Sequence, residues 1–220
     1  NAAMSQGYVS WKYRLNNNLT LVSGLHGLYF SVNREFSLEP RLAMHWQLAP
    51  TQAIHAGFGL HSKAESIITY YTMLNYPDGT SGTPNKKLGL SKAAHMVVGY
   101  EAQLTENLNT KIDLYYQALY QVPVENNDTS VFTMLNSDEG YVNVALTNAG
   151  KGSNYGIEYT LEHYFTGKYF FLLTASLYNS TYKAMDGVTR NTKYNGNYAV
   201  NFLAGKEFRV GSGAGANTLS

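Results

Sequence analysis

The chain has 220 residues, of which 44% are apolar and only 14% are charged. The charged share lies well below the roughly 25% of an average soluble protein, and a chain this rich in apolar residues does not have the composition of a disordered protein. The formal net charge of +1 argues against a nucleic-acid-binding protein, which needs a basic face. Because cysteine is absent, disulfides, thiolate metal sites and cysteine nucleophiles are excluded.

The aromatic and glycine content indicates many short strands joined by turns. The chain contains 19 tyrosines, 9 phenylalanines and 20 glycines; aromatic residues favour strands and glycine favours turns. The longest apolar run, near Phe170, reaches only about five residues, far short of the roughly 20 that a transmembrane helix requires. A membrane-spanning role would therefore have to use β-strands.

Nine segments alternate apolar and polar residues with a period of two, which is typical of strands with two unlike faces. In the clearest segment, Ile112 and Leu114 fall on one face while Lys111 and Asp113 fall on the other. The predicted strands are 7–15, 19–30, 37–48, 51–61, 91–104, 107–120, 153–165, 168–180 and 196–208.

Charged residues of these segments fall almost entirely on the polar face. Only Lys92 and Lys206 fall on the apolar face, and both lie near strand ends, where a long aliphatic stem can carry the ammonium to an interface. The middle of the apolar face carries no charge. A soluble sandwich and a membrane barrel would both produce such alternation.

The connections between the predicted strands alternate between short and long. Short turns at 16–18, 49–50, 105–106 and 166–167 alternate with longer loops at 31–36, 62–90, 121–152 and 181–195. In an antiparallel meander all the short turns then lie at one end of the sheet, as in transmembrane barrels with short periplasmic turns and long extracellular loops. A short helix is compatible with 63–75, whereas Gly99 in its middle favours strand over helix in 88–104.

Four runs, at 37–42, 91–101, 148–158 and 201–208, resemble barrel strands of TonB-dependent outer-membrane receptors of the Bacteroidota type. The resemblance implies a 22-stranded transmembrane β-barrel closed by an amino-terminal plug. We therefore expect an all-β fold, an antiparallel up-and-down meander of about nine strands. Residues 1–220 would form a partial β-barrel domain, with the plug and the remaining strands outside them.

The resemblance also implies the function and the partners. Such a receptor takes up a scarce ligand with energy transmitted through TonB from the inner membrane. The expected partners are outer-membrane lipid, the TonB complex, the plug domain and a small ligand, which is a siderophore, a sugar or a peptide. The implied location is the cell outer membrane, as a multi-pass β-barrel, and neither nucleic acid nor a cofactor is expected.

Signatures of catalysis are weak in this chain. Glu158 and Glu162 share a strand face but lie about 14 Å apart, beyond the separation that glycoside hydrolysis uses. The six histidines offer no pair spaced two residues apart for a metal. The glycine-rich runs at 150–153 and 211–215 lack the spacing or the following helix of a phosphate loop or a nucleophile elbow. We predict neither catalytic residues nor a metal site.

The two longest loops hold the candidate ligand-binding residues. Aromatic rings beside amide groups suit stacking on and hydrogen bonding to a small ligand, although such rings can also pack the loops against one another. The candidates are Tyr70, Tyr71 and Tyr76 in loop 62–90, and Phe132, Asn136 and Tyr141 in loop 121–152.

Two other functions stay open: a soluble β-barrel or sandwich that binds an apolar small molecule, and a surface-attached hydrolase. The receptor interpretation requires the apolar face to contact lipid. If Leu114, Ile157 and Trp46 met inside a closed protein interior, that interpretation would be wrong.

Overall fold

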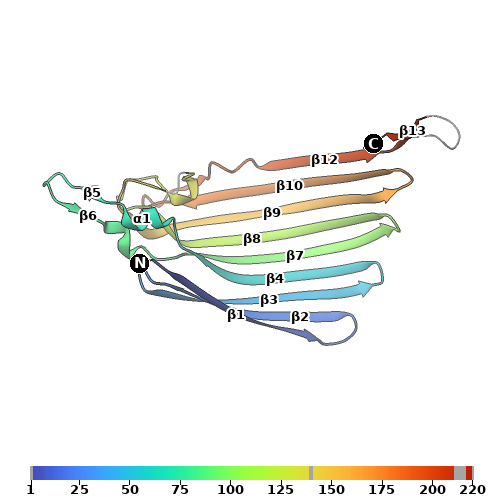
Figure 1. Cartoon of the computed structure of the whole chain (residues 1–220), viewed down its shortest axis with the longest axis horizontal. Helices are drawn as coiled ribbons and strands as arrows, with labels where there is room; N and C mark the ends of the chain where they lie inside the picture. The colour runs from blue at the N-terminus through green and yellow to red at the C-terminus, as the bar shows by residue number, and fades with distance from the viewer. Residues whose placement is uncertain (1, 139–140, 211–216, 220) are drawn as a thin grey trace.

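The computed structural model describes residues 2–138, 141–210 and 217–219. Their nine long strands lie in one antiparallel sheet in chain order (Figure 1), so the predicted meander is confirmed. These strands are β1 (Met4–Arg14), β2 (Leu19–Phe30), β3 (Glu35–Ala49), β4 (Gln52–Lys63), β7 (Ser91–Thr105), β8 (Leu108–Glu125), β9 (Leu146–Thr166), β10 (Tyr169–Lys183) and β12 (Tyr198–Lys206).

The remaining elements are short and lie in the connections. They are α1 (Ile67–Tyr71), β5 (Leu74–Asn75), β6 (Ser81–Gly82), η1 (Pro84–Lys87), η2 (Met134–Asn136), β11 (Thr189–Asn191), β13 (Phe208–Val210) and β14 (Asn217–Leu219). The short helix compatible with the first long loop is thus α1. The run 211–215, weighed above as a nucleophile elbow, lies outside the described residues.

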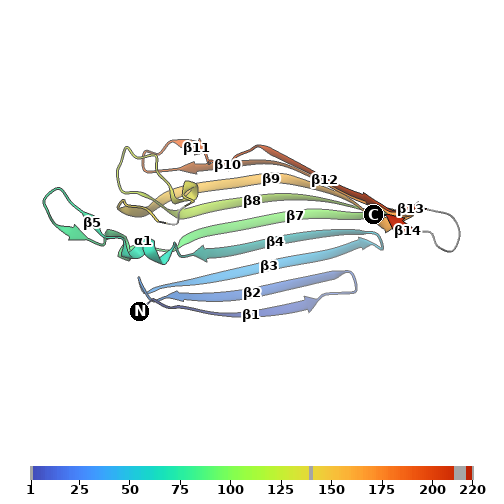
Figure 2. The ribbon, with the colours of Figure 1, turned by 45° about the horizontal axis from the view of Figure 1, so that its top comes forward.

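Long and short connections lie at opposite ends of the sheet, as predicted. The described parts of loops 64–90, 126–145 and 184–197 gather at one end, and the tight turns between β1 and β2, β3 and β4, β7 and β8, and β9 and β10 lie at the other (Figures 1 and 2). We refer to these as the loop end and the turn end.

Strand register aligns the apolar residues into continuous rows, because paired residues of antiparallel strands project from the same face. The resulting surface, which we call the apolar face, includes Leu114, Ile157 and Trp46, all of them exposed. One such row contains Tyr13, Leu21, Met44, Ala56, Val98, Leu114, Ile157, Leu177 and Tyr198.

The exposed area shows that this face is not folded into an interior. The accessible surface is 13818 Å² for a chain of 24.4 kDa, whereas a compact monomer of this mass exposes about 10,000 Å². The excess of about 3,800 Å² is expected of a single-layered sheet. A closed sandwich, the soluble alternative, is therefore not the fold of the described residues.

Strands β8 and β9 extend the furthest beyond their predicted ends. The β8–β9 pairing continues toward the loop end beyond a β-bulge, where Gln121 has φ 54° and the register shifts. The bulge changes which residues face inward, so that Val122 and Val124 are both buried, and Pro123 interrupts the period-two pattern. The predicted loop 121–152 is therefore wrong at both boundaries, and the loop covers 126–145.

Candidate functional site

The surface opposite the apolar face, which we call the polar face, carries a network of hydrogen-bonded side chains. Glu39 is only 2% exposed, yet each carboxylate oxygen has partners. Oε2 lies 2.9 Å from His26 Nδ1 and 3.3 Å from Arg41 Nη2, and Oε1 accepts the Ser62 backbone N–H at 2.9 Å. These partners offset the desolvation of a buried carboxylate.

A second pair on the polar face uses the space over a glycine. Asp113 Oδ1 lies 2.6 Å from His55 Nε2, and Oδ2 lies 2.8 Å from Lys111 Nζ. A Cβ at Gly99, which is paired with both His55 and Asp113 across the sheet, would lie only 2.1 Å from Asp113 Oδ1. Glycine at this position therefore lets the two side chains meet above the backbone.

A hollow of about 1120 Å³ lies along the polar face, lined by His61, His95, Gln117 and Glu158 among others. The His61 and His95 rings lie with centroids 4.6 Å apart. Within the described part of the chain, no three His, Cys, Asp or Glu side chains are grouped so as to hold a metal ion. The histidine, amide and carboxylate side chains of this lining can form hydrogen bonds with a polar surface that packs against the hollow.

At the loop end, an apolar cluster joins the loops to β2 and β9. Its buried members are Leu28, Phe30, Tyr70, Leu88, Leu90, Val142 and Leu146. Tyr70 is fully buried: its ring meets Phe30 edge-on at 5.1 Å, and its hydroxyl accepts the Glu65 backbone N–H. Burial raises the pKa of Tyr70 to about 12. This corrects the prediction for Tyr70, which packs the loop and is inaccessible to a ligand at the surface.

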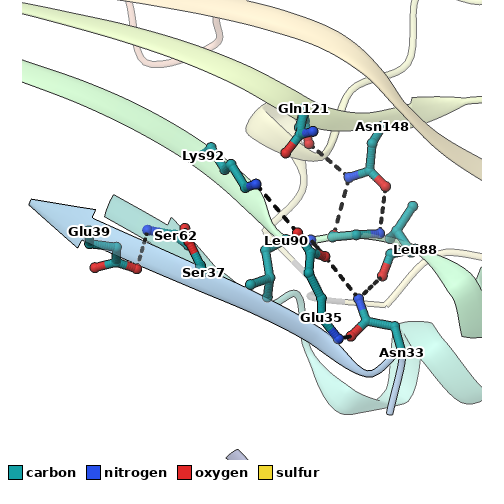
Figure 3. A network of polar contacts seen from close by, with 11 residues as sticks. Asn33, Glu35, Ser37, Glu39, Ser62, Leu88, Leu90, Lys92, Gln121 and Asn148 are labelled. Carbon is teal, nitrogen blue, oxygen red and sulfur yellow. Dashed lines mark hydrogen bonds and ion pairs between the residues drawn. The ribbon is translucent and has the colours of Figure 1, made fainter. Parts of the chain in front are cut away.

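Polar contacts hold the segment that returns from loop 64–90 to β7 (Figure 3). The Glu35 carboxylate accepts the Leu90 backbone N–H at 2.7 Å and an Asn33 amide N–H at 3.1 Å, and lies 3.5 Å from Lys92 Nζ. The Asn33 amide also donates to the Leu88 carbonyl at 2.7 Å. Glu35 thus ties this segment to β3 and provides the counter-ion for Lys92.

Two further side-chain amides tie the same loop to neighbouring strands. Asn148 Oδ1 accepts the Gly89 backbone N–H at 2.6 Å, and its Nδ2 donates to the Gln121 carbonyl at 2.8 Å (Figure 3). The fully buried Asn85 donates to the Val144 carbonyl at 3.0 Å and accepts the Leu146 N–H at 2.8 Å. Loop 64–90 is therefore fixed at several points.

The loops 126–145 and 184–197 contact each other through Asp138. Its carboxylate contacts the Lys193 ammonium and accepts the Tyr194 hydroxyl, and Asn136 Oδ1 accepts the Lys193 backbone N–H at 3.0 Å. Hydrogen bonds from Lys193 and Tyr194 hold the pKa of Asp138 below its ordinary value. Asn136 thus serves a contact between loops.

The remaining predicted residues lie at the same end of the sheet. Tyr71, Tyr76 and Tyr141 are exposed, while Phe132 is half-buried against the apolar cluster. Three exposed apolar residues in α1 or just after it were not singled out from the sequence, and no alternation marks them: Ile67, Ile68 and Met73. No helix in the described ranges is long and apolar enough to cross a membrane.

Neither protein-family models nor curated proteins match the sequence. Solved structures do match. The siderophore receptor PirA from Acinetobacter baumannii has a TM-score of 0.71 at 14% identity, over 92% of this chain and 31% of that chain. The FrpB iron transporter from Neisseria meningitidis (F3-3 variant) has a TM-score of 0.65 at 14% identity, over 95% and 31% of the two chains.

A third similar structure is the alcaligin outer-membrane receptor FauA from Bordetella pertussis, with a TM-score of 0.62 at 15% identity, over 97% of this chain and 35% of that chain. The chain spans about a third of the length of the structures it matches. At these identities the likeness defines the fold, an antiparallel meander similar to part of these transport proteins.

Proposed function

We propose that this chain is a stretch of the barrel wall of a TonB-dependent outer-membrane receptor, which takes up a scarce ligand with energy transmitted by TonB. In this proposal residues 1–220 are part of a 22-stranded barrel domain, completed by further strands and by a plug. The observation that carries the proposal is the uncovered apolar face, which lies opposite a hydrogen-bonded polar face.

The height of the apolar face fits a bilayer. On β8 its residues run from Leu108 to Tyr120, and the roughly 12 steps between these two residues span about 41 Å at about 3.4 Å per residue. With a strand tilt of about 40°, as in outer-membrane barrels, this corresponds to a height of about 31 Å. The hydrocarbon core of a bilayer is about 30 Å thick. The apolar face is therefore tall enough to match the lipid.

In the proposed barrel the polar face lines the lumen. Its hollow would receive the plug, whose surface can hydrogen-bond to groups such as Gln117 and Glu158. The loop end would lie at the cell surface. This arrangement assigns binding and transport to the chain and leaves it no reaction to catalyse.

We propose a siderophore as the ligand class, ahead of a sugar or a peptide, because the similar structures include siderophore receptors. The exposed rings of Tyr71, Tyr76 and Tyr141 are the proposed contacts, through stacking and hydroxyl hydrogen bonds. Phe132 packs against the apolar cluster and Asn136 bonds to the neighbouring loop, so both would contact the ligand only at the edge of the binding site. Loop anchoring by Asn85 and Asn148 would keep these rings in place, which lowers the entropic cost of binding.

The test uses the complete barrel expressed in cells. We expect it in the outer-membrane fraction, with ferric-siderophore uptake that is lost when TonB is deleted. Tyr71→Ala combined with Tyr76→Ala should weaken ligand binding at least tenfold, whereas Tyr198→Ala, on the apolar face, should leave binding unchanged. Recovery of a detergent-free soluble monomer would contradict the membrane assignment and favour the soluble apolar-ligand protein; uptake independent of TonB would contradict the transport mechanism.

A further inference from the structure

A groove of about 410 Å³ lies at the turn end, between β10 and β12. Its lining consists of Tyr169, Phe170, Phe171, Phe202, Ala204, Gly205 and Lys206. The register pairs Tyr169 with Lys206, Phe171 with Ala204 and Leu173 with Phe202. Paired residues share a face, and Leu173 is paired with Leu161 of β9, in the same parity as Ile157. The groove therefore lies on the apolar face.

The wall of this groove is aromatic and closely packed. Tyr169 stacks on the His163 ring with centroids 4.5 Å apart and 12° between planes, and Phe171 flanks the same ring at 5.4 Å and 20°. Such a gathering of aromatic rings at one end of membrane strands is typical of the lipid headgroup level.

Lys206 is a cation on an otherwise apolar surface, and its charge is available. Its ammonium lies 5.2 Å from the Phe208 ring centroid, and it forms no ion pair with any residue that the structure describes. Lys92, the other lysine assigned to the apolar face from the sequence, differs because it pairs with Glu35. An ammonium at the edge of an apolar groove is complementary to an anion that carries an apolar chain.

We propose that this groove binds one phospholipid, with an acyl chain along Phe171, Phe202 and Ala204 and its phosphate paired with the Lys206 ammonium. The Tyr169 hydroxyl, beside Lys206 across the strand pair, is a second donor for the headgroup. The inference rests on the proposed function, because it requires the apolar face to contact a bilayer. It adds a defined lipid, held on the membrane leaflet at the turn end.

The experiment titrates the complete barrel, extracted in mild detergent, with phosphatidylglycerol and counts bound lipids by native mass spectrometry. Lys206→Gln should weaken the first lipid about fivefold, the contribution of one basic residue at an anionic lipid surface. Lys183→Gln removes the same charge from an exposed position at the loop end of β10 and should change nothing.

A second pair of variants tests the groove itself. Ala204→Trp fills it while keeping the surface apolar, so it should reduce occupancy by the first lipid by a similar factor. Val200→Trp, four residues earlier on the same face of β12, lies outside the groove and should bind as the wild type does. Unchanged lipid affinity in both Lys206→Gln and Ala204→Trp would overturn the proposal, as would displacement of the lipid by millimolar inorganic phosphate.

Different results would contradict the proposed function and the proposed lipid site. Membrane insertion of every variant is measured first, from the heat-dependent electrophoretic mobility of folded barrels. A wild-type barrel that does not insert would contradict the proposed function. Inserted variants that bind lipid as the wild type does would contradict only the lipid site.

Discussion

Replacing one of two adjacent valines of β7 by arginine tests which face of the sheet contacts lipid. Val98 is 53% exposed on the apolar face, in register with Ala56 and Leu114. Val97 projects from the polar face, in register with Gly57 and Tyr115, and lines the hollow. The variants Val98→Arg and Val97→Arg thus place the same cation at the same height on opposite faces.

The expected free-energy cost of Val98→Arg depends on how deep residue 98 would lie in the bilayer. Val98 is the middle position of the apolar face on β7, six residues from both Lys92 and Leu104, or about 20 Å along the strand. In the proposed barrel, at a tilt of about 40°, each end would lie about 15 Å away in height, which would place Val98 at the bilayer midplane. Arginine there costs about 2 to 4 kcal/mol, a factor of about 30 to 900 in the folding equilibrium.

Val97→Arg should cost about 1 kcal/mol or less, because its long stem can lie over Gly57 and its guanidinium can reach the polar groups of the hollow. Urea unfolding of the complete barrel in phospholipid vesicles, followed by tryptophan fluorescence, measures both variants. Leu114→Arg should behave as Val98→Arg does, and Asp113→Asn should be tolerated. If Val97→Arg were the more damaging variant, the assignment of the two faces would be reversed.

Three further predictions concern local contacts. Asn85→Ala should destabilise loop 64–90 by about 2 to 4 kcal/mol, because a carbonyl and an N–H lose their buried partner; unchanged hydrogen exchange at the Leu146 amide would contradict this. His163→Phe should increase the free energy of unfolding by about 1 to 2 kcal/mol and so raise the denaturation midpoint. The reason is that phenylalanine keeps the ring stack and removes an Nδ1 that is buried without a partner among the described residues. A lower midpoint would refute this prediction. The pKa of Asp138 is depressed, so the contact between its loop and Lys193 should be complete above the ordinary value of 3.8 and be lost only as the pH falls through the lowered pKa. Distances between spin labels in the two loops would show this, and opening near pH 5 would contradict it.

The strands and their faces are predictable because one face is uncovered. In β8, Ile112 and Leu114 alternate with Lys111 and Asp113 without interruption, since no described part of the chain packs against Ile112 and Leu114 and both side chains stay exposed. Tertiary packing does not override such a pattern. The alternation fails only at Gln121 and beyond, where a bulge sets consecutive residues to unexpected faces.

The loop-end residues are far less predictable. Tyr70 and Tyr71 are identical neighbours on the five-residue α1, yet Tyr70 is fully buried and Tyr71 is exposed. The difference in their burial comes from Phe30, about 40 positions earlier in the chain, because only Tyr70 packs against its ring. Likewise, Lys92 and Lys206 have the same sequence signature, and only the position of Glu35 in space distinguishes the paired ammonium from the free one. Such differences arise from long-range contacts that local periodicity does not encode.

The two regions of the chain also differ in what stabilises them. The loop end has its own buried cluster and buried amides, so protein contacts alone hold its geometry. The apolar face has no covering layer among the described residues, and the outer edges of β1 and β12 pair with no other described strand. Free edges and uncovered apolar surface both promote aggregation in water. Loop geometry is therefore a property of these residues themselves, whereas in the proposed barrel the sheet would depend on lipid and on neighbouring strands for its stability. A loop variant such as Asn85→Ala should then alter ligand capture while leaving membrane insertion intact. An apolar-face variant such as Val98→Arg should impair membrane insertion while leaving the loop geometry that captures the ligand unchanged.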